Sequence, residues 1–155
     1  MKKETSEFVT RMKEQTIGVE IEMAEITRNQ AVKVVAKHYG TESTIERLND
    51  HYDSWACKDN KGRTWKISKD VSIQASSDLK KAELITPILK YEDIEDLQQI
   101  IRDLRKAKAI SNPDHCCGVH IHIGAGDHTP QTLRNLCNIM ASHEELLIGA
   151  LDIKE

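Results

Sequence analysis

Strict alternation of polar and apolar residues in three short segments constrains the fold of this chain most. The clearest example is HCCGVHIHIG at 115–124, where His120 and His122 stand two residues apart between aliphatic residues. Side chains alternate between the two faces of a β-strand, so this pattern predicts a half-buried strand with both imidazoles on one face and the aliphatic side chains on the other.

Two other segments have the same layout with carboxylates in place of imidazoles. GVEIEM at 18–23 places Glu20 and Glu22 on one face, and AELITPIL at 82–89 places Glu83 opposite Leu84. If the three strands lie side by side, one face of a sheet carries three glutamates and two histidines. This shared face is the central hypothesis drawn from the sequence.

Composition sets the broad class of the protein. The length of 155 residues predicts a single domain at 16–155, and the composition is 39% hydrophobic and 30% charged. Residues 1–15 are polar and charged and are expected to form a separate N-terminal segment. A net charge of −3 shows no basic surplus for nucleic acid, and no apolar run is long enough to span a membrane. The first residues lack the apolar core of a signal peptide, so we expect a cytoplasmic protein with free cysteine thiols.

The order of expected elements predicts an α+β domain with helices on one side of a mainly antiparallel sheet. The expected elements are a strand at 16–26, a helix from the Thr27 cap to Gly40, a hairpin at 52–67, the Glu83 strand, a helix at 91–109, the histidine strand and a helix from Thr129 to about 152. The last helix is expected to turn its apolar residues inward: Leu133, Leu136, Cys137, Met140, Leu147, Ile148 and Leu151.

Glu20 and Glu22 could simply lie on a solvated face of the sheet. Their strand is otherwise strongly apolar, however, which places it near the centre of the sheet. Two neighbouring carboxylates there repel each other and need a cation to stay ionised, and oxygen ligands suit Mg²⁺ or Mn²⁺. Glu83 alone would be interpreted as an ordinary surface residue. It becomes a candidate ligand only together with Glu20 and Glu22. Glu25 is expected to be exposed to solvent and to serve as a control.

Zinc is the alternative metal, because two cysteines and three histidines crowd into residues 115–122. The segment has no C-x-x-C pair, and alternation would send the adjacent Cys116 and Cys117 to opposite faces. Both cysteines are therefore interpreted as small buried residues. A zinc-dependent hydrolase that uses the same Glu/His face remains an open alternative.

Taken in order, the motifs resemble the amidoligase family. They are GVEIEM, a D-x-S loop at Asp70 and Ser72 that leads into AELITPIL, and N-x-x-x-C-C-G-V-H-I-H-I-G, and together they span residues 16–151. That family is similar to the glutamine synthetase and glutamate–cysteine ligase superfamily. The resemblance implies a glutamine-synthetase-like catalytic half and ATP-dependent amide-bond formation, in which an amine attacks an acyl phosphate made from a carboxylate.

The resemblance also implies two divalent cations, Mg²⁺ or Mn²⁺, that bridge the phosphates of ATP. Glu22 with Glu83 would hold one ion, and Glu20 with His120 would hold the other. His122 would lie toward the nucleotide phosphates. No residue is assigned as a catalytic group.

The chain departs from the family pattern in two ways. The family loop usually reads D-G-S, whereas here Asp70 and Ser72, expected to face the substrate, flank Val71, which cannot easily adopt a positive φ. Relatives also continue beyond the equivalent of Leu151 with arginines for phosphate and a further acidic ligand. We therefore expect a truncated ligase completed by a partner chain or a second copy that acts on a small-molecule, peptide or protein substrate; the alternative is a non-catalytic interaction module.

Overall fold

The chain forms two compact units in a computed structural model that describes residues 2–126 and 128–152. The units are Met1–Gly124 and Ala125–Glu155, and each is described by itself. The single domain at 16–155 stays a prediction.

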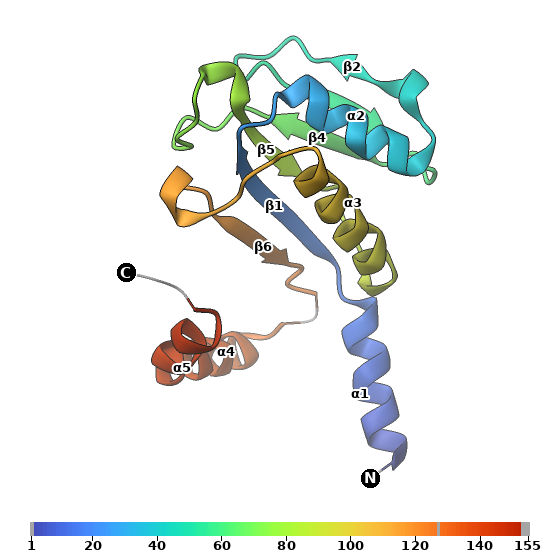
Figure 1. Ribbon diagram of the computed structural model, residues 1–155. Helices are drawn as coiled ribbons and strands as arrows, with labels where there is room; N and C mark the ends of the chain where they lie inside the picture. Colours follow the sequence, from blue (N-terminus) through green and yellow to red (C-terminus); the bar gives the residue numbers. More distant parts are fainter. Residues whose placement is uncertain (1, 127, 153–155) are drawn as a thin grey trace. The chain divides into compact units, whose positions relative to one another are not determined.

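The first unit contains a six-stranded sheet in which all neighbouring strands are antiparallel. In spatial order the strands are β2 (Glu46–Arg47), β3 (Trp55–Lys58), β4 (Thr64–Ser68), β5 (Lys81–Ile85), β1 (Ile17–Ala24) and β6 (Val119–Ile123) (Figure 1). The predicted α+β class with a mainly antiparallel sheet is confirmed. The three strands that carry the predicted site residues, β5, β1 and β6, are consecutive.

The described residues contain five α-helices. They are α1 (Lys2–Glu14), α2 (Arg28–Tyr39) and α3 (Ile94–Lys106) in the first unit, and α4 (Pro130–Ser142) and α5 (Glu144–Ala150) in the second. Helix α2 begins and ends as its sequence predicts. Thr27 and Gln30 form a reciprocal capping box at its start, and Gly40 ends it in the left-handed conformation with φ of +66°.

The hydrophobic core lies between one face of the sheet and helices α2 and α3. The strands contribute Val19, Ile21, Met23, Trp65, Ile67 and Leu84, and the helices contribute Val32, Val35, Leu97, Ile100 and Leu104. Because side chains alternate along each strand, burying this set places Glu20 and Glu22 on the other face. The core therefore positions the candidate site.

Strand β6 differs from the half-buried strand that its sequence predicts. Val119, Ile121 and Ile123 are 55%, 65% and 60% exposed. The strand occupies an edge of the sheet, beside β1 and outside the strands whose side chains form the core (Figure 1). Its alternation is real, but position in the sheet rather than periodicity decides burial.

The second unit also corrects two expectations. The single helix predicted to reach residue 152 is two helices that meet at His143, whose backbone is non-helical with φ of −120° and ψ of 13°. The His143 Nδ1 atom lies 2.9 Å from both Ser142 Oγ and the Ile139 carbonyl oxygen. The seven residues expected to face inward are exposed except Leu147, which is half-buried, because no apolar layer among the described residues of this unit covers them.

Within 2–126 and 128–152, no helix combines the length and the apolar character needed to cross a bilayer. The cytoplasmic location stays a prediction.

Candidate functional site

Strand pairing brings the predicted carboxylates and imidazoles together on one face of the sheet. In the β1–β5 pair Glu22 lies directly opposite Glu83, and in the β1–β6 pair Glu20 lies opposite His120 and Gly18 opposite His122. Side chains of directly opposed residues lie within contact distance of one another. The sequence pattern correctly placed both imidazoles on the same face as the glutamates.

Among the described residues, two groups of side chains could each hold a metal ion, and within each group the potential ligand atoms lie within 4.8 Å of one another. The first, called here the Glu20 group, consists of Glu20, Glu83 and His120. The second, the Glu22 group, consists of Glu22, Asp70 and Glu83. Glu83 belongs to both groups, so the two positions share a ligand.

Asp70 is the member that the sequence did not assign to a cation. The D-x-S motif indicated a loop that faces the substrate, whereas the structure brings its carboxylate beside Glu22 and Glu83. The available signal was its position in the loop directly before the acidic strand. A loop that precedes a strand can fold back over its first residues, but the sequence does not show that it does so.

Both histidines of β6 contact Glu20. His120 Nδ1 lies 3.2 Å from Glu20 Oε2, and His122 Nε2 lies 3.3 Å from Glu20 Oε1. Both imidazoles are more than half exposed, while the Glu20 side chain is 30% exposed. His122 therefore lies at the solvent-exposed side of the site, opposite Gly18, which has no side chain.

Glu22 is the most enclosed carboxylate of the site. It is only 7% exposed, and its Oε2 accepts a hydrogen bond of 2.7 Å from the Gly118 backbone N–H. In the part of the chain that the structure describes, no lysine or arginine forms an ion pair with any carboxylate of the two groups. A buried carboxylate without a cationic partner is costly, and a bound cation would relieve this cost.

Glu83 is affected most by this crowding. Burial raises the pKa of its carboxyl group, and the negative charges of Glu20, Asp70 and Glu22 raise the pKa further, while His120 opposes them. Loss of solvation and repulsion between like charges both disfavour the ionised form. A cation between these oxygens would reverse the balance, because it favours the carboxylate.

The loop that carries Asp70 closes on its own side chain. Asp70 Oδ1 accepts hydrogen bonds from the Ser72 backbone N–H at 2.7 Å and from the Ser72 hydroxyl at 2.5 Å. Val71 is 76% exposed and does not adopt a positive φ. The turn is thus built by the aspartate side chain, which needs no glycine at its centre.

Glu25 is not the exposed residue that the sequence indicated. Its carboxylate accepts hydrogen bonds from the Ser76 N–H at 2.6 Å, the Ser76 hydroxyl at 2.7 Å and Lys80 Nζ at 3.0 Å. The Ser76 contacts, supported by Lys80, lower the pKa of Glu25 to about 2. A residue that follows β1 was expected to point into solvent, but the loop before β5 lies against it.

In residues 2–126 and 128–152, the cysteines do not join the neighbouring histidines in a group that could hold a metal ion. All four are free thiols, as predicted. Cys116 is exposed and Cys117 half-buried, so the interpretation of both as small buried residues was wrong. Cys116 ends a short 3₁₀ turn in the left-handed conformation with φ of +53°, before the strand begins, so strand alternation does not apply to it. Across the described residues, neither of the two groups that could hold a metal ion includes a cysteine.

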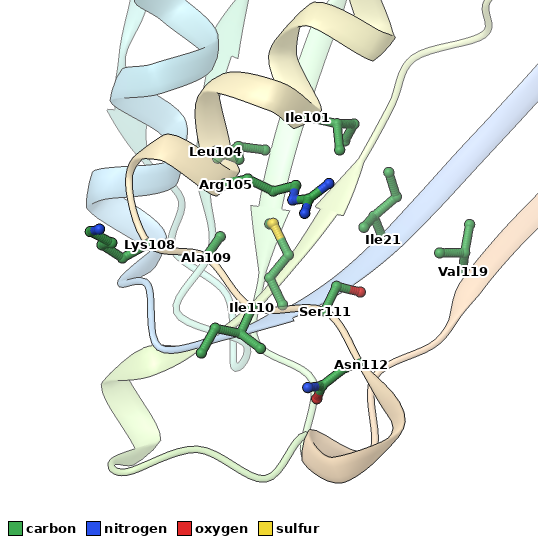
Figure 2. A pocket seen from close by; sticks show the side chains of 11 residues that line it. Ile21, Ile101, Leu104, Arg105, Lys108, Ala109, Ile110, Ser111, Asn112 and Val119 are labelled. Carbon is green, nitrogen blue, oxygen red and sulfur yellow. The ribbon is translucent and has the colours of Figure 1, made fainter. Parts of the chain in front are cut away.

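A separate cavity of about 730 Å³ lies on the other face of the sheet (Figure 2). It is lined by Ile21, Met23 and Val119 from the strands and by residues of α3 and the turn after it, including Arg105 and Lys108. No member of the Glu20 or Glu22 group lines it. The carboxylate face and this cavity are therefore distinct features of the sheet.

Comparison with known families identifies a match over almost the whole chain. The sequence profile of a family described as "Putative amidoligase enzyme" matches residues 13–155. No curated protein and no solved structure matches the chain.

Proposed function

Because the chain belongs to the amidoligase family, whose name indicates a ligase-type function, we propose that it is an ATP-dependent carboxylate–amine ligase. The observation that carries this proposal is the arrangement of the two ligand groups. Four carboxylates and an imidazole from three strands and one loop converge without a lysine or arginine ion pair among the described residues. Such a surface is suited to divalent cations and, through them, to the phosphates of a nucleotide.

The donor set fits Mg²⁺ or Mn²⁺. Glu20, Glu83 and His120 would hold one ion, and the Glu22 group would hold the other, with Glu83 shared between them. This division adds Asp70 to the ligands implied by the family resemblance. When bound, the two ions supply the positive charge that phosphoryl transfer from ATP to a carboxylate requires.

The residues around the cations have separate proposed tasks. His122 is more than half exposed beside Gly18, where it can donate to a nucleotide phosphate. Ser72, whose hydroxyl donates to Asp70, would face the substrate together with it. Gly118 donates to Glu22 and thereby leaves the other oxygen of that carboxylate available to a cation.

A second copy or a partner chain is proposed to supply the arginines that bind phosphate. This follows from the described surroundings of the site, in which no arginine pairs with the ligand groups. The amine and the carboxylate can belong to small molecules, peptides or proteins. The chain would act in the cytoplasm.

Zinc hydrolysis is the second candidate, and the structure favours it less. Four of the five proposed ligands are carboxylates and one is a histidine, whereas catalytic zinc sites commonly rely on several nitrogen or sulfur ligands. A non-catalytic interaction module would bind neither metal nor nucleotide.

Calorimetric titration of the full chain with Mn²⁺, and then with Mg²⁺ and a non-hydrolysable ATP analogue, tests the proposal. We expect two Mn²⁺ ions per chain and nucleotide binding that depends on the metal. Glu20→Gln should weaken Mn²⁺ binding at least about tenfold, as even outer-shell changes at metal sites do. Glu46→Gln, on the exposed strand β2, is the matched control and should leave binding unchanged.

Equal effects of the two substitutions would contradict the first-strand site. Zinc binding without nucleotide binding would support the hydrolase instead, and absence of both metal and nucleotide binding would support the interaction module.

A further inference from the structure

Glu25, directly after β1, has a backbone conformation that L-residues rarely adopt. Its φ is +64°, and it is not a glycine. The left-handed conformation is unfavourable for a residue other than glycine, and it persists only where the surrounding contacts require it. At Glu25 these contacts are the three hydrogen bonds that its carboxylate accepts.

The other partner in these contacts is the segment at 69–80, which connects β4 to β5. Ser76 donates both its backbone N–H and its hydroxyl to Glu25, one to each carboxylate oxygen. A two-point contact of this kind sets the orientation of the segment as well as its distance from β1. Lys80 adds an ion pair of 3.0 Å to the same carboxylate.

The same segment presents Asp70 to the Glu22 group. Between Asp70 and Ser76, the Ile73 side chain is fully buried, and the Gln74 N–H donates to the His115 carbonyl oxygen at 2.8 Å. Ile73, Gln74 and Ser76 therefore anchor the segment on the C-terminal side of Asp70, and Lys81 Nζ adds a hydrogen bond of 3.3 Å to the Val71 carbonyl oxygen. The contact at Ser76 is made by the side chain of Glu25, the residue directly after β1.

We propose that Glu25 is a positioning residue that, through Ser76, holds the 69–80 segment where Asp70 completes the Glu22 group. Strand β1 and the residue directly after it would thus both serve the second cation: Glu22 in the strand ligates it, and Glu25 just beyond the strand places the loop ligand. This inference rests on the proposed metal-dependent function. It adds a residue that touches neither ligand group yet determines the affinity of one of the two cation positions.

Mn²⁺ titration of the full chain tests this role with the variants Glu25→Gln, Glu25→Gly, Ser76→Ala and Asp70→Asn. Glu25→Gln keeps the size of the side chain and the backbone conformation. It replaces the negatively charged carboxylate, whose two oxygens accept from Ser76, by a neutral amide with one accepting oxygen. We expect it to weaken one of the two Mn²⁺ sites about tenfold and to leave the other within about twofold, in the range known for outer-shell partners. Ser76→Ala should weaken the same site.

Glu25→Gly separates positioning from simple stability. Glycine relieves the left-handed strain, so this variant should fold at least as well as Glu25→Gln while losing the contact with Ser76. We expect it to show the same selective loss of Mn²⁺ affinity. Retention of wild-type affinity in Glu25→Gly would overturn the proposal.

The double variant Glu25→Gln with Asp70→Asn provides the final test. If Glu25 acts through Asp70, its substitution should have no further effect once Asp70 is changed, whereas additive losses would contradict the proposal. Failure of the proposed function gives a different result, because the wild-type chain itself would then bind no Mn²⁺. If the wild-type chain binds two Mn²⁺ ions and Glu25→Gln binds them with the same affinities, the role of Glu25 is refuted while the proposed metal-dependent function is not.

Discussion

Two carboxylate clusters in the first unit differ in whether basic side chains neutralise their charge. Near the start of α3, Asp59 and Asp93 are almost fully buried and share the guanidinium of Arg63, with Lys61 as a further partner of Asp93. On the opposite side of the sheet from the core, Glu83 stands among other carboxylates with no lysine or arginine ion pair in the described chain. One cluster contains its own cations, and the other does not.

The pKa values of Asp93 and Glu83 shift in opposite directions. Hydrogen bonds from Arg63, together with Lys61, hold the pKa of Asp93 well below its usual range. Burial and neighbouring negative charges raise the pKa of Glu83. Paired carboxylates of the first kind stabilise the folded chain, whereas the second kind is tolerated at a cost in stability. Surfaces that carry such a cost are frequent at functional sites.

The largest expected effect follows from breaking the paired cluster. Asp93→Ala leaves Arg63 and Lys61 without their shared partner and removes the acceptor of the Lys90 backbone N–H. We expect a loss of about 3 kcal/mol in the free energy of unfolding, measured by urea denaturation. Glu92→Ala, which removes the exposed partner of Lys61, should cost no more than about 0.5 kcal/mol. Similar losses in both variants would show that the cluster is not a stabilising feature.

Removing the shared ligand of the other cluster should have the reverse effect on stability. Glu83→Gln eliminates repulsion with its neighbours, so the metal-free protein should gain about 0.5 kcal/mol. Mn²⁺ binding should fall at least about 100-fold at both sites, because Glu83 belongs to both ligand groups. Urea denaturation and calorimetric titration measure the two quantities. If Glu83→Gln is less stable than the wild type and still binds Mn²⁺, the carboxylates around Glu83 are not a destabilising cation site.

The smallest expected effect is the pH dependence of metal stabilisation. The pKa of Glu83 is raised above its ordinary value of 4.5, so the folded state holds this proton more tightly than the unfolded chain does. Its contribution to stability is therefore fully present below pH 4.5 and is lost as the pH rises through the folded-state pKa. Mn²⁺ favours the ionised form and should offset this loss.

Thermal melts with and without Mn²⁺ measure this dependence. We expect little increase in Tm at about pH 4 and an increase of about 4 °C at about pH 7. The difference should disappear in Glu83→Gln. An equal increase at both pH values would show that the metal binds elsewhere.

The sequence alone determined which side chains share a face. A β-strand has a period of two residues, so Glu20 with Glu22 and His120 with His122 had to point to the same side wherever their strands were placed. Helix α2 was equally predictable, because the Thr27–Gln30 box and Gly40 act within one or two turns. These are local rules that need no knowledge of distant residues.

Only the tertiary structure decided how the strands and loops meet. The register that sets Glu83 against Glu22, the approach of Asp70 to Glu22 and the contact of Glu25 with Ser76 all join residues more than 40 positions apart. Strand β6 has the right alternation, yet its apolar face is exposed because the strand lies at an edge. Burial, register and loop anchoring depend on which distant surfaces come into contact, and periodicity along the chain carries no information about that.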